Sequence, residues 1–117
     1  MLKELIEEIL KEERVRKTVA SKMIGKICMF RTYSAGVHFG ELVEKNNQEC
    51  LVKNARRVFY WTDACSLSQL AMEGSKDISN CKIAMVVSEI VLDQVIEIIP
   101  MSKEAIDVLG GAKDWKK

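Results

Sequence analysis

The sequence predicts an α+β domain: a mainly antiparallel sheet or small curled barrel, with a long N-terminal helix and two short helices. Three observations predict this class. Apolar residues recur every three or four positions in the first 24 residues, several short β-branched and aromatic segments follow, and strands and helices do not alternate at βαβ lengths. With 117 residues, 48% of them hydrophobic, the chain can build one core, so we expect a single domain over residues 1–117.

A helix over residues 1–25 is the first predicted element, and we expect it to project from the sheet. Its acidic residues come first and basic residues follow from Arg14 to Lys26, an order that suits the helix dipole and is typical of a solvated helix end. Such a helix is ~34 Å long, about as long as a small domain is wide, so part of its apolar stripe would be exposed. The stripe comprises Leu2, Leu5, Ile6, Ile9, Val15, Val19, Met23 and Ile24.

The exposed part of this stripe predicts a homodimer or higher homo-oligomer, because a symmetric partner that packs the same stripe removes it from water. We expect the contact to involve Leu2, Leu5, Ile6 and Ile9. The alternative is that the helix bends near Glu13 and covers its own sheet, which leaves a monomer.

Residues 26–100 are predicted to form the sheet. β-branched and aromatic residues dominate its segments, and Gly25 is placed to end the preceding helix. Asn46 and Asn47 tolerate the positive φ angles of a tight hairpin turn, and Pro100 closes the sheet. The expected strands are Lys26–Thr32, a hairpin over Val37–Lys53, Ala55–Trp61, Ile83–Leu92 and Gln94–Ile99.

Two short helices complete the predicted fold. Ser66 and Gln69 have the spacing of a capping box, which predicts a short helix at residues 66–73. Residues 102–117 are expected to form a C-terminal helix, capped by Ser102, and a polar tail that frays.

Composition and cysteine spacing limit the possible functions. The 18 basic and 17 acidic residues give a net charge of +1, so no global field favours nucleic acid or an anionic membrane. The chain does not open like a secretory signal, and its apolar runs are shorter than the ~20 residues of a membrane helix, which predicts a cytoplasmic protein. Without a C-x-x-C pair we expect no metal, and we expect no cofactor. An even number of cysteines allows two disulfides, but without a secretory signal we expect four reduced thiols: Cys28, Cys50, Cys65 and Cys81.

No residue pattern indicates catalysis. The cysteines have no activating sequence around them, and there is a single histidine, so we do not expect an enzyme. That histidine, His38, is either a strand residue with a satisfied ring or a ligand contact. Gly36 and Gly40 lack the helix and lysine that follow a phosphate-binding loop, and we expect them to permit a bulge or a close backbone approach.

The segment from Lys53 to Trp61 holds the most informative cluster of side chains. Arginine binds phosphate through two parallel hydrogen bonds, and neighbouring aromatic rings can stack on bases. Side chains alternate along a strand, so Arg56 and Arg57 point to opposite faces and hydrophobic residues follow each of them. The cluster therefore predicts either a nucleotide site or a core face opposite a surface that ends in a charge.

The central part of the chain resembles a known family. Small uncharacterised proteins of tailed bacteriophages and prophages share patterns close to T-Y-S-A-G-V-H-x-G, K-N-A-R-R-x-x-x-W and S-L-x-x-[LI]-A. The chain is similar to them in the blocks TYSAGVHFGELVEK, LVKNARRVFYW and ACSLSQLAMEG, which lie between Arg31 and Gly74, and more weakly at Val95 to Pro100. The resemblance implies a phage origin and a place in the host cytoplasm, and it assigns no activity.

Together, these observations predict a non-enzymatic phage protein that binds a small anionic, nucleotide-like ligand, as a counter-defence sponge for a host immune signal. The assignment as a counter-defence sponge rests on the implied phage origin and on the small size of the chain, and not on a shared fold. Arginines would neutralise phosphate, aromatic rings would stack, and hydroxyl and imidazole groups would donate hydrogen bonds. The expected site residues are Arg31, Arg56 and Arg57 for phosphate, Tyr33 and Trp61 for stacking, and Ser34, His38 and Ser66 for hydrogen bonds.

Two other classes of protein fit the same sequence. A nucleic-acid-associated phage accessory protein would use the basic half of the first helix, from Arg14 to Lys26, together with Arg31 and Lys53. Its binding would weaken steeply with salt, whereas binding in a small buried site would not. A structural or protein-binding oligomer would need no ligand.

Overall fold

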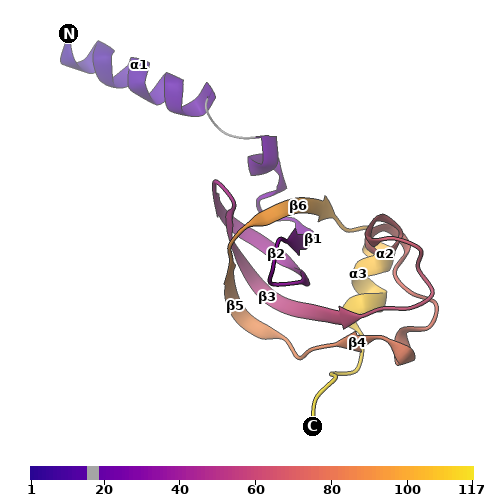
Figure 1. Ribbon diagram of the computed structural model, residues 1–117. Helices are drawn as coiled ribbons and strands as arrows, with labels where there is room; N and C mark the ends of the chain where they lie inside the picture. Colours follow the sequence, from indigo (N-terminus) through magenta and orange to yellow (C-terminus); the bar gives the residue numbers. More distant parts are fainter. Residues whose placement is uncertain (16–18) are drawn as a thin grey trace.

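The sheet has six antiparallel strands in the order β4-β3-β2-β1-β6, with β5 also paired to β3. A computed structural model describes the backbone of residues 1–15 and 19–117 and the side chains of residues 1–9 and 19–117 (Figure 1). In chain order the elements are α1 (Leu2–Val15), the 3-10 helix η1 (Val19–Met23), β1 (Ile27–Thr32), β2 (Val37–Asn46), β3 (Glu49–Tyr60), α2 (Leu67–Glu73), the 3-10 helix η2 (Ile78–Asn80), β4 (Lys82–Ile83), β5 (Val87–Leu92), β6 (Val95–Pro100) and α3 (Lys103–Gly110).

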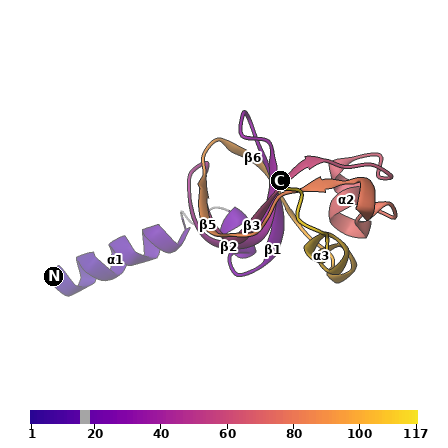
Figure 2. The ribbon, with the colours of Figure 1, turned by 90° about the horizontal axis from the view of Figure 1, so that it is seen from below.

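β3 is the longest strand and organises the sheet. One of its edges pairs with β2, while the other pairs with β5 near Cys50–Ala55 and with β4 at Val58 and Tyr60. The sheet curls strongly (Figure 2), but its hydrogen-bonded order ends at β4 and β6, so it stays open. The predicted fold class is therefore corrected: the protein is mostly an open antiparallel sheet, not a closed barrel, and its three α-helices are all short.

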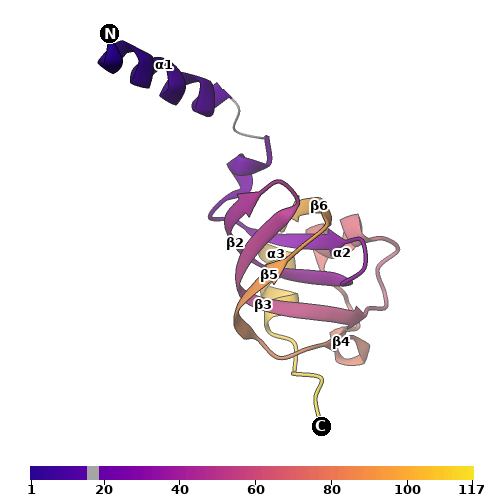
Figure 3. The same ribbon diagram turned by 60° about the vertical axis from the view of Figure 1, so that its left-hand side comes forward.

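The prediction of one long helix over residues 1–25 is wrong. α1 ends at Val15 and η1 follows at Val19–Met23, while residues 16–18 lie outside the described part of the chain. Figures 1 and 3 show α1 standing away from the sheet, and the apolar residues of its stripe whose side chains are described are exposed. A helix without tertiary packing depends on intrinsic propensity, which sustains only marginal stability at this length. The exposed fractions are 72% for Leu2, 56% for Leu5, 50% for Ile6 and 50% for Ile9.

The same correction affects the predicted basic half of the helix. Lys22 lies in η1 and Lys26 lies in the turn before β1, so the basic residues from Arg14 to Lys26 do not share one helix. The alternative of a helical nucleic-acid-binding surface loses this support.

β1 contributes to two separate cores because its side chains alternate across the sheet. Met29 faces a first core beneath α2 and α3, whereas Cys28 and Phe30 face a second core enclosed by the curled sheet, and all three are fully buried. The first core contains Met29, Phe39, Val58, Leu70, Ala71, Ile83, Met101, Ala105 and Leu109. The second contains Cys28, Phe30, Leu42, Cys50, Val52, Ala55, Leu92 and Val95.

A β-bulge in the β2–β3 hairpin determines which side chains face each core. The pairing shifts between Phe39 and Glu41, so that two residues of β3 lie opposite Gly40, and the first of them, Asn54, has a φ of +51°. Gly40 is required here because a Cβ atom would lie 2.7 Å from the Val52 side chain. The bulge reverses the alternation along β3, which turns residue 56 toward the first core and residue 57 toward the opposite face.

The hairpin turn and both short helices form where local signals predict them. Asn47 adopts a positive φ of 55° in the β2–β3 turn. The Ser66 hydroxyl accepts a hydrogen bond from the N–H of Gln69 at the start of α2, and Ser102 caps α3 in the same way. α2 and α3 pack together on the first core (Figure 1).

Candidate functional site

Arg57 and His38 are cross-strand neighbours on β3 and β2 and form the polar centre of the candidate site. Arg57 Nε–H donates to His38 Nε2 at 3.2 Å, and Nη2–H donates to the Ala35 carbonyl oxygen at 2.6 Å. Ala35 is held in the β1–β2 turn because its own N–H donates to the Thr32 hydroxyl at 2.8 Å. The turn after β1, strand β2 and strand β3 therefore converge on one guanidinium group.

His38 is 2% exposed, and its environment favours the neutral imidazole ring. Because Nε2 accepts from Arg57, the proton of the neutral ring lies on Nδ1, which has no hydrogen-bond partner among the described residues. Burial, and secondly the charge of Arg57, lowers the pKa of His38 to about 4. The ring is thus a neutral hydrogen-bond acceptor for the arginine at physiological pH.

The lowered pKa of His38 predicts a pH-dependent stability. Between about pH 6.5 and 4 the unfolded chain binds a proton at this ring that the folded chain does not, so stability falls as pH falls. One proton gives a slope of up to about 1.4 kcal/mol per pH unit. Urea unfolding at pH 7 and pH 5 measures the difference, and His38→Gln, which removes the only histidine, is the matched control. An equal pH dependence in this variant contradicts the assignment.

A groove of about 290 Å³ lies beside Arg57. The Arg57 Cζ atom lies 5.3 Å from the centroid of the Phe59 ring, a cation–π distance. Arg57 Nη1 has no hydrogen bond to the described residues, so it can bind an acceptor in the groove. Besides Arg57 and His38, the lining is apolar and consists of Ala55, Phe59, Ala84, Met85, Val87 and Ile90.

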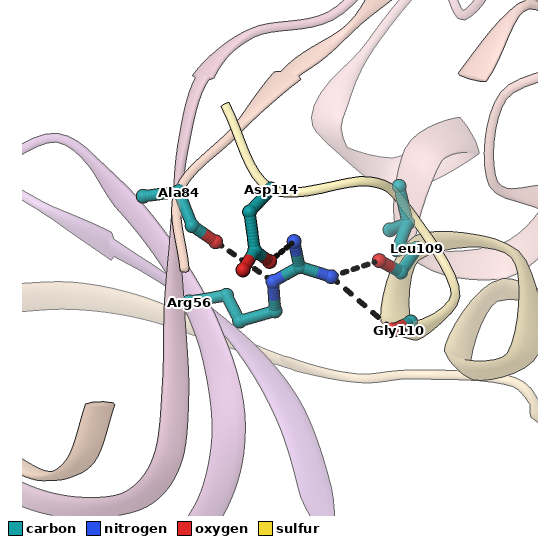
Figure 4. A network of polar contacts seen from close by, with 5 residues as sticks. All are labelled: Arg56, Ala84, Leu109, Gly110 and Asp114. Carbon is teal, nitrogen blue, oxygen red and sulfur yellow. Dashed lines mark hydrogen bonds and ion pairs between the residues drawn. The ribbon is translucent and has the colours of Figure 1, made fainter. Parts of the chain in front are cut away.

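Arg56, predicted to bind phosphate, is a structural residue instead. It is 3% exposed, and its Nε–H donates to the Ala84 carbonyl oxygen at 2.8 Å. Nη1 donates to the carbonyl oxygens of Leu109 and Gly110, both at 3.2 Å, and Nη2 pairs with the Asp114 carboxylate at 3.0 Å (Figure 4). All three guanidinium nitrogens are thus engaged, and Nη1 lies at the C-terminal end of α3, where a positive charge also complements the helix dipole.

The remaining five predicted site residues do not line the groove. Arg31 is exposed on β1, and Tyr33 and Ser34 lie in the β1–β2 turn, where the Ser34 hydroxyl hydrogen-bonds across to the β5–β6 turn. Trp61 packs against the first core, and the Ser66 hydroxyl is used to cap α2. In the structure Trp61 thus serves packing and Ser66 serves capping, and their ligand roles stay predictions.

Three residues near the site are not among the predicted site residues. Phe59 belongs to the Lys53–Trp61 cluster and lies on the same face of β3 as Arg57, as strand alternation predicts, but it was not assigned to the site. Trp115 lies in the predicted frayed tail, but its backbone N–H donates to the Ile83 carbonyl oxygen at 2.8 Å. The centroid of its ring lies 5.0 Å from the centroid of the Phe59 ring. Lys82 lies 5.5 Å from the Trp115 ring. The tail is therefore ordered against β3 and β4.

The cysteines and acidic residues add no second polar centre to the described part of the chain. All four thiols are free, and burial raises the pKa of Cys28 to about 11 and also raises that of Cys50. Within the described residues, no group of three or more His, Cys, Asp or Glu side chains is arranged to hold a metal ion. Nor does any described helix combine the length and hydropathy needed to cross a membrane.

The protein is thus a small domain with an open antiparallel sheet, and an arginine side chain lies in an otherwise largely apolar groove on this sheet. The chain belongs to the family described as Domain of unknown function (DUF6948), whose family model matches residues 25–109. This range includes the whole sheet and most of α3 and excludes α1. No curated protein and no solved structure shows significant similarity to the chain.

Proposed function

We propose that the protein binds a small anionic, nucleotide-like ligand in the groove beside Arg57 and does not turn it over. The supporting observation is the Arg57 guanidinium group. His38 and Ala35 fix two of its nitrogens, while Nη1 makes no hydrogen bond to the described residues. A charged donor that is held before binding loses little side-chain entropy when it meets an anion.

The shape and lining of the groove support a small ligand with a flat apolar part. A volume of about 290 Å³ is at the lower end of the ~300–1,000 Å³ typical of ligand pockets. The Phe59 ring and the side chains of Met85 and Val87 can contact a base, while Arg57 binds a phosphate. The lining contains no serine, cysteine or carboxylate side chain, which supports binding without turnover.

A phage origin and a host-cytoplasmic location are part of the proposal. The resemblance of the central sequence blocks to phage and prophage proteins supports both. In that setting the ligand is a nucleotide-derived signal of the host, and the protein acts as a sponge that withholds the signal from its receptor.

Arg57→Ala is expected to weaken binding of a ribonucleoside 5′-monophosphate by about 10- to 150-fold, because a hydrogen bond to a charged group contributes ~1.5–3 kcal/mol. Isothermal titration calorimetry with the four monophosphates measures this loss. Arg31→Ala is the matched control, because Arg31 is exposed on β1 and does not line the groove. Equal losses in the two variants, or no binding to the unmodified protein, contradict the proposal.

We also propose that the protein forms a homo-oligomer through α1. The exposed residues Leu2, Leu5 and Ile9 recur at helical spacing, and α1 stands away from its own sheet (Figure 3). A second copy of α1 is the partner that fits this surface, because pairing the same stripe of two copies buries the apolar residues of both chains at once.

A further inference from the structure

Three aromatic rings are half exposed where β3 ends and the C-terminal tail crosses it. The exposed fractions are 52% for Phe59, 50% for Tyr60 and 49% for Trp115. The Phe59 and Trp115 centroids lie 5.0 Å apart with an interplanar angle of 58°. Exposing half of an aromatic ring to water is energetically unfavourable. The three rings therefore either pack the tail against the sheet or form a binding surface.

Two positively charged side chains lie at cation–π distance from these rings. The Lys82 Nζ atom lies 5.9 Å from the Tyr60 centroid and 5.5 Å from the Trp115 centroid. At the other end, Arg57 lies 5.3 Å from the Phe59 centroid. The five side chains form one series, Arg57–Phe59–Trp115–Lys82–Tyr60, which we call the cation–aromatic row. The tail adds three exposed lysines beside it: Lys113, Lys116 and Lys117.

Tail docking does not by itself explain the row. The tail is already held by the backbone hydrogen bond from Trp115 to Ile83 and by the ion pair of Asp114 with Arg56. That ion pair also neutralises the acidic side chain of the tail, so the charge beside the rings is positive. The rings keep about half of their surface exposed, and this surface is available to a ligand.

We infer that the cation–aromatic row binds a short single strand of nucleic acid that continues from the groove. The inference rests on the proposed function and deepens it: one nucleotide occupies the groove at Arg57 with its base on Phe59, and the following bases stack on Trp115 and Tyr60. A mononucleotide needs only one ring, and three rings flanked by cations match successive bases and phosphates. Duplex bases are already stacked and paired, so they cannot use the ring faces.

The test compares a 12-nucleotide strand with a single nucleotide. Fluorescence anisotropy measures binding of labelled oligothymidylate and oligouridylate, which separates DNA from RNA, and calorimetry measures binding of the matching monophosphates. We expect each strand that binds to do so at least tenfold more tightly than its monophosphate, and its affinity to fall as salt rises. A 12-base-pair duplex is expected to bind no more tightly than a monophosphate.

Variants separate the row from the groove. Trp115→Ala is expected to weaken binding of the 12-nucleotide strand by about 5- to 150-fold, the effect of losing one stacked base, and to change monophosphate binding less than twofold. Tyr60→Ala is expected to act similarly and leaves the tail hydrogen bonds intact, so it decides the question if Trp115→Ala unfolds. Lys103→Ala is the control, because Lys103 is exposed on α3, outside the row.

Each outcome has a distinct meaning. Monophosphate binding with no gain for the longer strand overturns the inference and leaves the proposed function standing. Strand binding that survives both aromatic variants, or that the duplex matches, also overturns it. If the strand binds and the monophosphates do not, the groove proposal fails while the row stands, and binding of neither overturns both.

Discussion

Arg56→Ala is expected to lower the free energy of unfolding by about 3 kcal/mol, because it removes three hydrogen bonds from a buried guanidinium group to main-chain carbonyl acceptors, at ~1 kcal/mol each. These acceptors belong to Ala84, Leu109 and Gly110. The Asp114 side chain is 39% exposed and can return to water, so its lost ion pair adds little. Equilibrium urea unfolding measures the change.

The neighbouring residue provides the matched control for this prediction. Arg57→Ala removes the same side chain from the opposite face of β3, where it is only partly buried, and we expect a loss of about 1 kcal/mol. Arg56→Lys keeps the positive charge but lacks the planar fork, so we expect it to recover only part of the stability. Similar losses for Arg56→Ala and Arg57→Ala contradict the structural role assigned to Arg56.

The second large effect concerns assembly. We expect the full chain to elute at a multiple of its 13.3 kDa mass, and Leu5→Lys combined with Ile9→Lys to give a monomer. The reason is that both residues lie in the exposed stripe of α1, and two buried lysines cannot be accommodated in a helix seam. Size-exclusion chromatography with light scattering measures the mass.

Glu4→Lys is the control for this experiment, since it places a lysine on the polar side of the same helix. A chain that starts at Lys26 tests the same point, because neither core includes any of the α1 residues whose side chains are described. A monomeric full chain refutes the proposed assembly. An oligomer that persists in the shortened chain moves the interface to the sheet.

The sequence correctly predicted those turns and helix ends that are determined by residues close together in the chain. The Asn46–Asn47 turn and the caps at Ser66 and Ser102 each depend on residues within four positions, and the structure has them where expected. The first helix was predicted too long because its apolar pattern continues beyond Val15, whereas helix length also depends on packing that the sequence pattern does not report.

In the candidate site, too, the residues could be predicted from the sequence, whereas their contacts across long sequence separations could not. His38 and Arg57 were both predicted, but their pairing depends on the register of β2 with β3 and on the bulge opposite Gly40. Arg56 was assigned to the ligand because its partners lie 28 to 58 residues away in sequence, at separations that no local pattern reports. Trp115 was missed because a lysine-rich segment gives no sign of where it docks.

The Arg56 network also has a consequence for how the chain folds as it is synthesised. Arg56 is translated 58 residues before Asp114, a delay of about 3 to 12 s at ribosomal rates of ~5–20 residues per second. During that interval the β2–β3 hairpin can form, but its buried charge has neither the α3 carbonyl oxygens nor the carboxylate. A nascent chain that stops before residue 109 therefore cannot complete the first core, and truncated translation products are expected to be readily degraded by proteases.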